Sequence, residues 1–143
     1  MRNFPEKLKE LIKYNNLTKN SVSSLLGLNN ETKIYALLNG KNTPRFQTIV
    51  KLANIFKCSI DYLVGRTENF VEVKPKTLPN FNLQFKKVLK ETKVTQYKLL
   101  DDKIISNGHL NSWLNDKMTP STENIIKLAD YLNVSIDYLV GRE

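Results

Sequence analysis

Apolar side chains recur at helical spacing along most of the chain. Near the beginning, Leu8, Leu11 and Ile12 share one helix face, and this pattern stops at Asn15 and Asn16. Residues spaced three and four apart lie on the same side of an α-helix and can be buried together. The spacing therefore predicts a short amphipathic helix.

Four more short helices follow by the same reasoning. Thr18 is placed to cap the second helix, and the third covers roughly residues 30–38. Thr43 and Pro44 predict the start of the fourth helix, because a hydroxyl caps a helix and a proline at the first position loses no hydrogen bond. Ser59 is placed to cap the fifth.

The second half of the chain repeats the first. The octapeptide SIDYLVGR of residues 59–66 recurs letter for letter at residues 135–142. Upstream, Phe4 aligns with Phe81, and the residues that follow them match in a register that differs by one from that of the octapeptide. The chain is therefore a duplication with one extra residue in its first copy.

A stretch without helical pattern separates the two copies. Residues 67–80 contain two prolines, which is typical of a linker, and within them residues 69–73 alternate briefly as a short strand would. We expect an all-α protein with two tandem five-helix domains, residues 1–66 and 81–143, joined by this proline-containing linker.

The charge of the chain favours a polyanionic partner. The sequence has 22 Lys plus Arg against 14 Asp plus Glu, for a net charge of +8. Residues 1–72 hold 11 basic and 6 acidic residues, and residues 73–143 hold 11 and 8. A basic protein is drawn to nucleic acid because each neutralised phosphate releases counterions. Charge alone does not single out DNA, since many basic proteins bind other partners.

The composition weighs against several other classes of protein. No apolar run is long enough to span a membrane, and the first residues lack the apolar stretch of a signal peptide. Cys58 is the only cysteine, so no internal disulfide can form and a reducing cytoplasm is expected. His109 is the only histidine, and no metal-ligand spacing or glycine-rich phosphate loop is present. We expect no enzyme, no catalytic residue, no metal site and no cofactor.

Each copy carries a set of short motifs. Those of the first copy are Leu26-Gly27-Leu28, Asn39-Gly40-Lys41, Thr43-Pro44, Leu52-Ala53 and the octapeptide. Those of the second copy are Val94-Thr95-Gln96, Ser106-Asn107-Gly108, Trp113, Thr119-Pro120-Ser121 and the same octapeptide. With these motifs the sequence resembles the lambda-repressor/Cro-like helix-turn-helix family, also called the xenobiotic-response-element type. The resemblance implies two tandem helix-turn-helix domains that bind double-stranded DNA.

The resemblance also implies that the third helix of each copy enters the major groove. The residues presented there by the first copy would be Asn29, Asn30, Glu31, Thr32, Lys33 and Tyr35. Those presented by the second copy would be Ser106, Asn107, Gly108, His109, Asn111 and Ser112. Asn can pair with adenine and Lys can reach the acceptors of guanine, so these residue types suit base recognition. The alternative for each residue is an ordinary solvated polar face.

Further candidate contacts flank these helices. Lys19 and Gln96 stand at the start of the second helix of each copy, where contacts to the DNA backbone are expected, and Gln96 could also touch an outer base. The candidate phosphate contacts in or near the loop after the recognition helix are Lys41, Asn42, Arg45 and Lys117. Such contacts position a protein without reading sequence.

Two departures from the family pattern affect these assignments. The first copy is expected to carry its extra residue near Thr32 and Lys33, at the start of the recognition helix. The second copy has Ile104 where the family favours the turn glycine. It also has acidic residues unfavourable to phosphate, namely Asp101, Asp102 and Asp116, the last of which stands where the first copy has Gly40. If only one copy binds DNA, we expect the first.

The sequence therefore predicts a sequence-specific transcription regulator of a bacterium or phage, acting as a repressor rather than an activator. The alternative is a protein-interaction module with the same fold, such as an anti-repressor, an antitoxin or an inhibitor. The linker, residues 67–80, would reach roughly 46–50 Å when extended. One chain could thus place both domains on adjacent grooves, but its two recognition helices differ. We therefore expect a homodimer, which restores the symmetry of a palindromic site.

Overall fold

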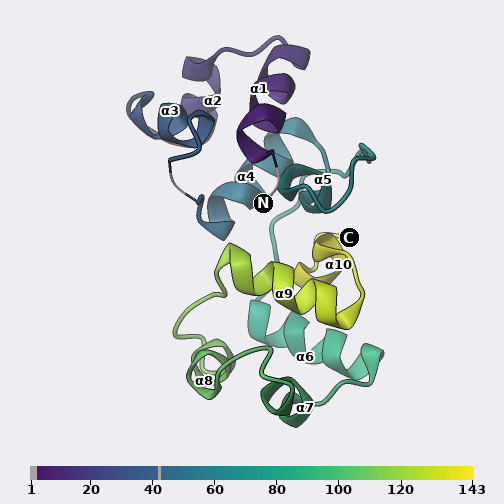
Figure 1. The fold of residues 1–143 in the computed structure, drawn as a ribbon. Coiled ribbons are helices and arrows are strands. Elements are labelled where there is room, and N and C mark those ends of the chain that lie inside the picture. Colours follow the sequence, from purple (N-terminus) through teal and green to yellow (C-terminus); the bar gives the residue numbers. More distant parts are fainter. Residues whose placement is uncertain (1–2, 42) are drawn as a thin grey trace. The chain divides into compact units, whose positions relative to one another are not determined.

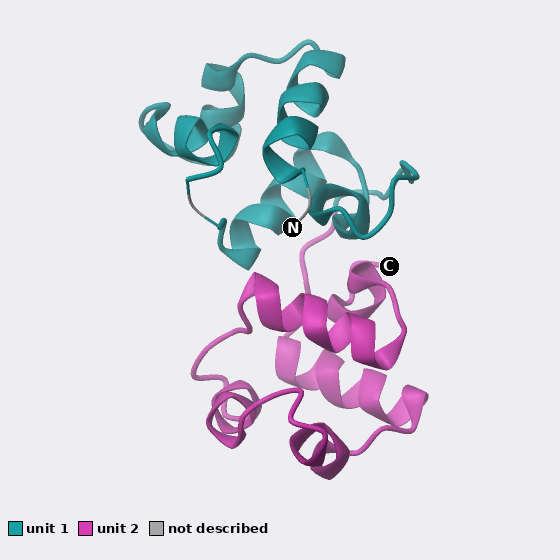
Figure 2. Ribbon diagram, viewed as in Figure 1, with its two compact units in different colours: residues 1–75 teal, residues 76–143 magenta. Residues whose placement is uncertain are grey.

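The computed structural model describes residues 3–41 and 43–143. The chain divides into two compact units, residues 1–75 (unit 1) and 76–143 (unit 2), which are teal and magenta in Figure 2. Over the described residues each unit consists of five α-helices, and β structure is limited to one isolated bridge between Cys58 and Glu72. The predicted all-α class with two tandem helical domains is confirmed.

Figure 1 labels the helices in chain order. Unit 1 contains α1 (Phe4–Tyr14), α2 (Lys19–Leu25), α3 (Thr32–Leu38), α4 (Phe46–Phe56) and α5 (Ile60–Val64). Unit 2 contains α6 (Phe81–Thr92), α7 (Gln96–Asp101), α8 (Asn107–Leu114), α9 (Thr122–Leu132) and α10 (Ile136–Val140). In the described part of the chain, no helix combines the length and apolar character needed to cross a membrane.

Each unit encloses its own apolar core. The fully buried side chains of unit 1 include Leu8, Val22, Ile34, Ile49, Leu52, Ile60 and Leu63. Those of unit 2 include Phe85, Leu99, Ile125, Leu128, Ile136 and Leu139. Trp113 is also buried and lies edge to face with the rings of Phe81 and Phe85. The third helix of each unit is thus anchored by its inner face.

Several predicted helix starts are confirmed by capping hydrogen bonds. The Thr18 hydroxyl accepts a hydrogen bond of 3.0 Å from the backbone N–H of Ser21, at the start of α2. The Ser59 hydroxyl accepts one of 3.0 Å from Tyr62 at the start of α5. These bonds satisfy donors that the first turn of a helix leaves without intrahelical partners.

The predicted start of the fourth helix is wrong. Thr43 does not cap this helix and Pro44 is not its first residue, because α4 begins only at Phe46, after the extended residue Arg45. A residue that precedes proline is restricted to extended conformations, which keeps Thr43 out of the helix. The proline itself is buried at the edge of the core.

Unit 2 shows the same arrangement with a better cap. Its α9 begins at Thr122, and the Ser121 hydroxyl accepts a hydrogen bond of 3.2 Å from the backbone N–H of Asn124. Pro120 precedes this cap and is buried, as its counterpart is in unit 1. The Thr-Pro pair of each copy therefore marks the end of a loop rather than the first turn of a helix.

The extra residue of the first copy lies in the second helix, not near the recognition helix as predicted. Nine residue steps separate the capping Thr18 from Gly27, which has the left-handed φ of +77° that follows α2. Only eight steps separate Thr95 from Lys103, which has the equivalent φ of +58° after α7. Lys103, and not Ile104, therefore takes the place of the turn glycine.

Both recognition helices consequently share one alignment. From the turn onward the two copies match in the register of the octapeptide, so Thr32 and Lys33 correspond to Gly108 and His109. The start of the first recognition helix differs from the prediction, since α3 begins at Thr32 rather than at residue 30. The side chains that α3 and α8 expose can therefore be compared position by position.

The repeated octapeptide closes each unit with a buried ion pair. In unit 2, Arg142 Nη1 lies 2.6 Å from Asp137 Oδ1, and the two side chains are 0% and 3% exposed. Arg66 and Asp61 form the same pair in unit 1, where the side chains are 22% and 12% exposed. The sequence predicted only a favourable place in the first helical turn for these aspartates. Their pairing with the last residue of the octapeptide was not predicted.

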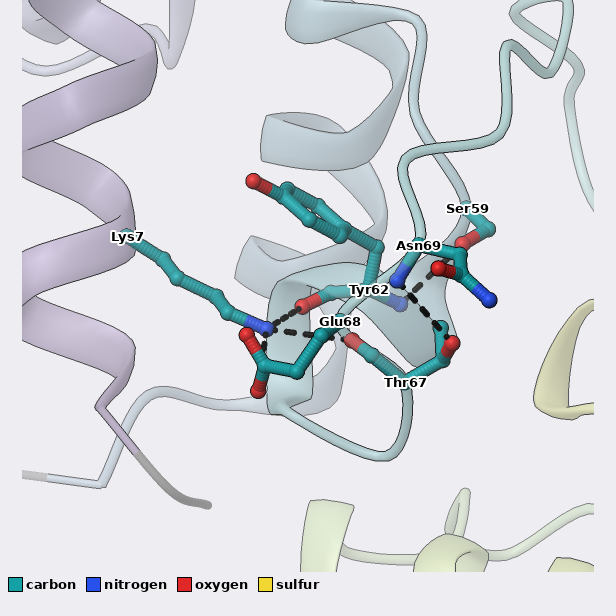
Figure 3. A network of polar contacts seen from close by, with 6 residues as sticks. All are labelled: Lys7, Ser59, Tyr62, Thr67, Glu68 and Asn69. Carbon is teal, nitrogen blue, oxygen red and sulfur yellow. Dashed lines mark hydrogen bonds and ion pairs between the residues drawn. The ribbon is translucent and has the colours of Figure 1, made fainter.

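A buried lysine joins the first and last helices of unit 1 (Figure 3). Lys7 is 5% exposed, and its Nζ donates hydrogen bonds to the carbonyl oxygens of Tyr62, at 2.8 Å, and Thr67, at 3.2 Å. The Glu68 carboxylate lies 3.6 Å from the same nitrogen, so the buried charge is paired. α1 is thereby fastened to the end of α5.

Unit 2 has an uncharged version of this contact. Gln84 stands at the position of α6 that corresponds to Lys7 of α1, and its Nε2 donates a hydrogen bond of 2.9 Å to the carbonyl oxygen of Tyr138. The two copies thus keep the acceptor and differ in the donor.

Parts of the expected linker contact the units themselves. Two backbone hydrogen bonds, of 3.1 and 3.0 Å, flank the Cys58–Glu72 bridge and hold residues 71–73 on unit 1. In unit 2, Pro79 packs directly against Gly141. A β-carbon added to Gly141, whose φ is +85°, would lie only 2.5 Å from the Pro79 ring. Only the segment between residues 73 and 79 therefore remains to connect the two units. It is much shorter than the expected linker, residues 67–80.

The corrected turn in unit 2 can be tested by glycine substitution. Lys103→Gly should stabilise unit 2 by about 0.5–1 kcal/mol, because glycine adopts a positive φ without the steric cost of a side chain. Ile104→Gly should destabilise the unit, since it removes apolar contacts and loosens the unfolded chain. Trp113 is the only tryptophan, so its fluorescence during urea unfolding reports on unit 2. A stabilising Ile104→Gly would contradict the new alignment.

The duplication supplies a matched test of the closing ion pair. Asp137→Ala should destabilise unit 2 by about 3–5 kcal/mol, because it leaves a fully buried guanidinium without its counter-charge. Asp61→Ala should cost unit 1 clearly less, since Arg66 reaches water. Urea unfolding followed by circular dichroism and by Trp113 fluorescence would measure both losses. Equal losses in the free energy of unfolding would show that the stability each ion pair contributes does not depend on its burial.

Candidate nucleic-acid interface

The recognition helix of unit 1 turns a polar face to solvent. Ile34, Leu37 and Leu38 are buried, while Thr32 and Lys33 are exposed on the other side of α3. Asn29 and Asn30 are exposed just before the helix, Tyr35 is exposed further along it, and Glu31 is half-buried. The predicted contacts of this helix therefore lie on or beside one accessible surface.

Asn30 has a structural role that the sequence analysis missed. Its Oδ1 accepts a hydrogen bond of 2.9 Å from the backbone N–H of Thr32, which starts α3. Ser106 holds the equivalent position in unit 2, and its hydroxyl accepts one of 3.1 Å from His109. Asn and Ser are favoured before a helix for this reason, which is the signal that could have identified the role. With this oxygen engaged, Asn30 is poorly placed for a bidentate pair with adenine.

The recognition helix of unit 2 has a different surface. Its predicted contacts Asn107, Gly108, His109 and Asn111 are exposed, and Ser112 is half-buried. The His109 ring stacks parallel to the buried Trp113, with ring centroids 6.1 Å apart, which holds the imidazole along the helix. This face carries no lysine or arginine, in contrast to Lys33 of α3.

Three predicted contacts of unit 1 form one cluster. Lys19 Nζ lies 4.7 Å from the centroid of the Tyr35 ring, a cation–π contact that joins the start of α2 to α3. The Tyr35 hydroxyl donates a hydrogen bond to the Glu31 carboxylate, and this bond raises the pKa of Tyr35. Tyr35 therefore stays protonated at neutral pH, and its ring lies beneath Lys19.

An open groove of about 550 Å³ adjoins this cluster, between α1, α2 and α3. Its charged and aromatic lining consists of Lys9, Lys13, Lys19, Glu31 and Tyr35. The sequence analysis did not select Lys9 or Lys13. Their spacing of four residues on the polar face of the first helix was the available signal.

The predicted backbone contacts lie at the ends of the helices. Lys41 is exposed directly after α3, and Arg45 is exposed just before α4. Asn42 lies outside the described residues. In unit 2, Lys117 is exposed after α8, whereas Gln96 at the start of α7 is half-buried.

Unit 2 carries acidic groups near its second helix. Tyr131 donates a hydrogen bond of 2.6 Å to Asp102, which lowers the pKa of that carboxyl group. Lys98 lies 3.3 Å from Asp102 and contributes in the same direction. Asp101 and Asp116 are exposed in the same unit. Asp102 is therefore ionised at neutral pH and opposes the approach of phosphate.

The net charge is divided unequally between the units. Residues 1–75 hold 12 basic and 6 acidic residues, a formal charge of +6, and residues 76–143 hold 10 and 8, a formal charge of +2. Unit 1 therefore has the stronger attraction for a polyanion.

Comparison with known proteins agrees with this geometry. Residues 6–68 match a family described as a helix-turn-helix domain, and residues 85–139 match one described as helix-turn-helix. No curated protein and no solved structure matched the chain. The fold and the two matches define a helix-turn-helix protein. More narrowly, the two matches support a tandem duplication of helix-turn-helix domains like those of the lambda-repressor/Cro type. Domains of this type indicate a DNA-binding regulator.

Proposed function

We propose that this chain is a sequence-specific DNA-binding transcriptional regulator of bacterial or phage type, and that it acts as a repressor in the cytoplasm. The main support is that each copy keeps a complete five-helix unit whose third helix has a buried apolar side and an exposed polar side. Occupation of a promoter by such a protein blocks transcription without any chemistry.

Unit 1 is the principal DNA-binding unit in this proposal. It carries the larger positive charge, and its recognition helix exposes Lys33 between the flanking basic residues Lys19 and Lys41. Lysine can donate to the guanine acceptors in the major groove, whereas lysines beside the helix contact phosphates.

The surface of unit 2 favours a second candidate function. Leu83, Tyr97 and Met118 of this unit are exposed at 68%, 74% and 55%. Unit 1 exposes large apolar side chains as well, such as Tyr14 at 84%, so the acidic groups beside them are what distinguishes unit 2. Exposed aromatic and methionine side chains are enriched where proteins bind each other. Unit 2 is therefore the candidate for a protein-interaction module, such as an anti-repressor, an antitoxin or an inhibitor.

Selection of bound fragments from random duplex DNA tests the proposed function. The full chain should enrich one motif, and its affinity for that motif should fall steeply between low and physiological salt. Lys33→Ala should cost about 1–3 kcal/mol at the selected site and relax its base preference, while Lys41→Ala should weaken selected and random DNA alike. Lys33 is a cleaner test than Asn30, because Asn30 also starts α3.

The control for this selection is the same chain with Lys33→Ala and Lys41→Ala combined. If the unmodified chain enriches no motif, or if its affinity does not depend on salt, the regulator function is refuted and the protein-interaction function is favoured.

We further propose that the protein acts as a homodimer. Helix-turn-helix dimers place two recognition helices about 34 Å apart. The segment between residues 73 and 79 extends by roughly 20 Å at most, which limits how one chain could place its two units. The two recognition helices also differ at aligned positions, since Lys33 corresponds to His109. A palindromic site therefore requires two chains.

Light scattering and footprinting together test the homodimer. The free protein should have twice the mass of one chain, 16.5 kDa, and should protect two like half-sites. A monomer that protects an asymmetric pair of unlike half-sites would contradict the homodimer and would assign one half-site to each unit.

A further inference from the structure

The groove between α1, α2 and α3 gathers positive charge that the protein does not neutralise. Lys9, Lys13 and Lys19 line it, and Glu31 is the one acidic side chain among the described residues that do so. In the described part of the chain, Lys9 and Lys13 form no ion pair, and both are exposed. Like charges four residues apart on a helix lie close enough to repel each other.

The remaining groups of the groove hold Lys19 in position. The Tyr35 ring lies 4.7 Å from Lys19 Nζ, and the Glu31 carboxylate accepts the hydrogen bond of the Tyr35 hydroxyl. This hydrogen bond engages Glu31 with Tyr35 and leaves its single negative charge beside the lysines. Three lysines and one glutamate therefore line the groove, which gives its lining a formal charge of +2.

Unit 2 has part of this arrangement. The lysine pair recurs there as Lys86 and Lys90, which align with Lys9 and Lys13. Gln96 and Asn111 stand where unit 1 has Lys19 and Tyr35, so the cation–π contact and the third charge are missing. The complete basic groove belongs to unit 1.

We propose that this groove binds the phosphodiester backbone of the DNA strand that unit 1 contacts, with Lys9 and Lys13 as phosphate contacts. Tyr35 is then a positioning residue for Lys19 and not a base contact. This assignment rests on the proposed DNA-binding function. It adds a contact surface on the first helix to the predicted contacts of the second and third helices.

A double variant, Lys9→Gln with Lys13→Gln, tests the phosphate contacts. Glutamine keeps the helix propensity of lysine, and both positions are exposed, so the fold should be unchanged by circular dichroism. Affinity should fall by the same factor for the selected duplex and for random duplex DNA. The slope of log affinity against log salt should decrease by about 2, roughly one for each lysine.

The matched control removes the same charge elsewhere on unit 1. Lys51 and Lys57 are exposed and do not line the groove, so Lys51→Gln with Lys57→Gln should leave the salt slope nearly unchanged. If both double variants reduce the slope equally, general charge explains the effect and the groove proposal is refuted. An unchanged slope in the groove variant refutes it as well.

A neutral methylphosphonate placed at single positions along the selected duplex locates the contact. At one or two positions, the methylphosphonate should weaken binding by the unmodified chain. At those positions it should not weaken binding by the groove variant any further, because that variant has already lost the same interaction. If the loss of affinity from the methylphosphonate and the loss from the lysine substitutions add at every position, the groove does not contact the backbone.

Two substitutions of Tyr35 test its positioning role. Tyr35→Phe keeps the ring beneath Lys19 and should retain affinity, whereas Tyr35→Leu should weaken binding as much as Lys19→Gln and leave the selected motif unchanged. A changed base preference in Tyr35→Leu would show that Tyr35 contacts a base. Loss of the groove contacts in a chain that still enriches one motif would refute this inference alone, whereas no enrichment by the unmodified chain would refute the proposed function.

Discussion

The carbonyl oxygen of one tyrosine joins the first and last helices of each unit. Tyr62 and Tyr138 lie in the last turn of α5 and α10, where each carbonyl accepts a hydrogen bond of 3.2 Å from the backbone N–H of the glycine that ends the helix. The side chain of Lys7 or Gln84 donates a second hydrogen bond to this carbonyl from the first helix. Because this bond links residues that lie far apart in the sequence, it holds the first helix of each unit against the last. The core between them, and with it the anchored side of the recognition helix, depends on that closure.

The two copies join their first and last helices through different side chains. Lys7 brings a charge that is paired with Glu68 of the following segment, while the Thr67 carbonyl accepts a further hydrogen bond. Gln84 brings no charge, and its unit instead buries the Arg142–Asp137 pair almost completely. The identical octapeptides thus lie in different electrostatic surroundings. A duplication can therefore preserve backbone closure while its surfaces diverge.

The candidate site shows the same division between scaffold and surface. Asn30 and Ser106 start the recognition helices, so part of the polar face serves the fold. Sequence reasoning predicted DNA contacts at both residues, and the hydrogen bonds add a structural role to that prediction. Helix-starting residues and base-reading residues are of the same chemical types, and only the hydrogen bonds distinguish them. Lys9 and Lys13 were missed because the groove they line is formed by three helices.

The sequence by itself determined the duplication, the helical class and the buried faces. These features follow from local spacing, as with Leu8 and Leu11, and from exact repetition of the octapeptide. The tertiary structure decided which residue takes the left-handed turn, because either Lys103 or Ile104 satisfies the local pattern. It also decided the contact between Lys7 and Tyr62, which lie far apart in the sequence, and the one between Lys19 and Tyr35. Such contacts depend on how helices cross in space, which no local pattern along the chain specifies.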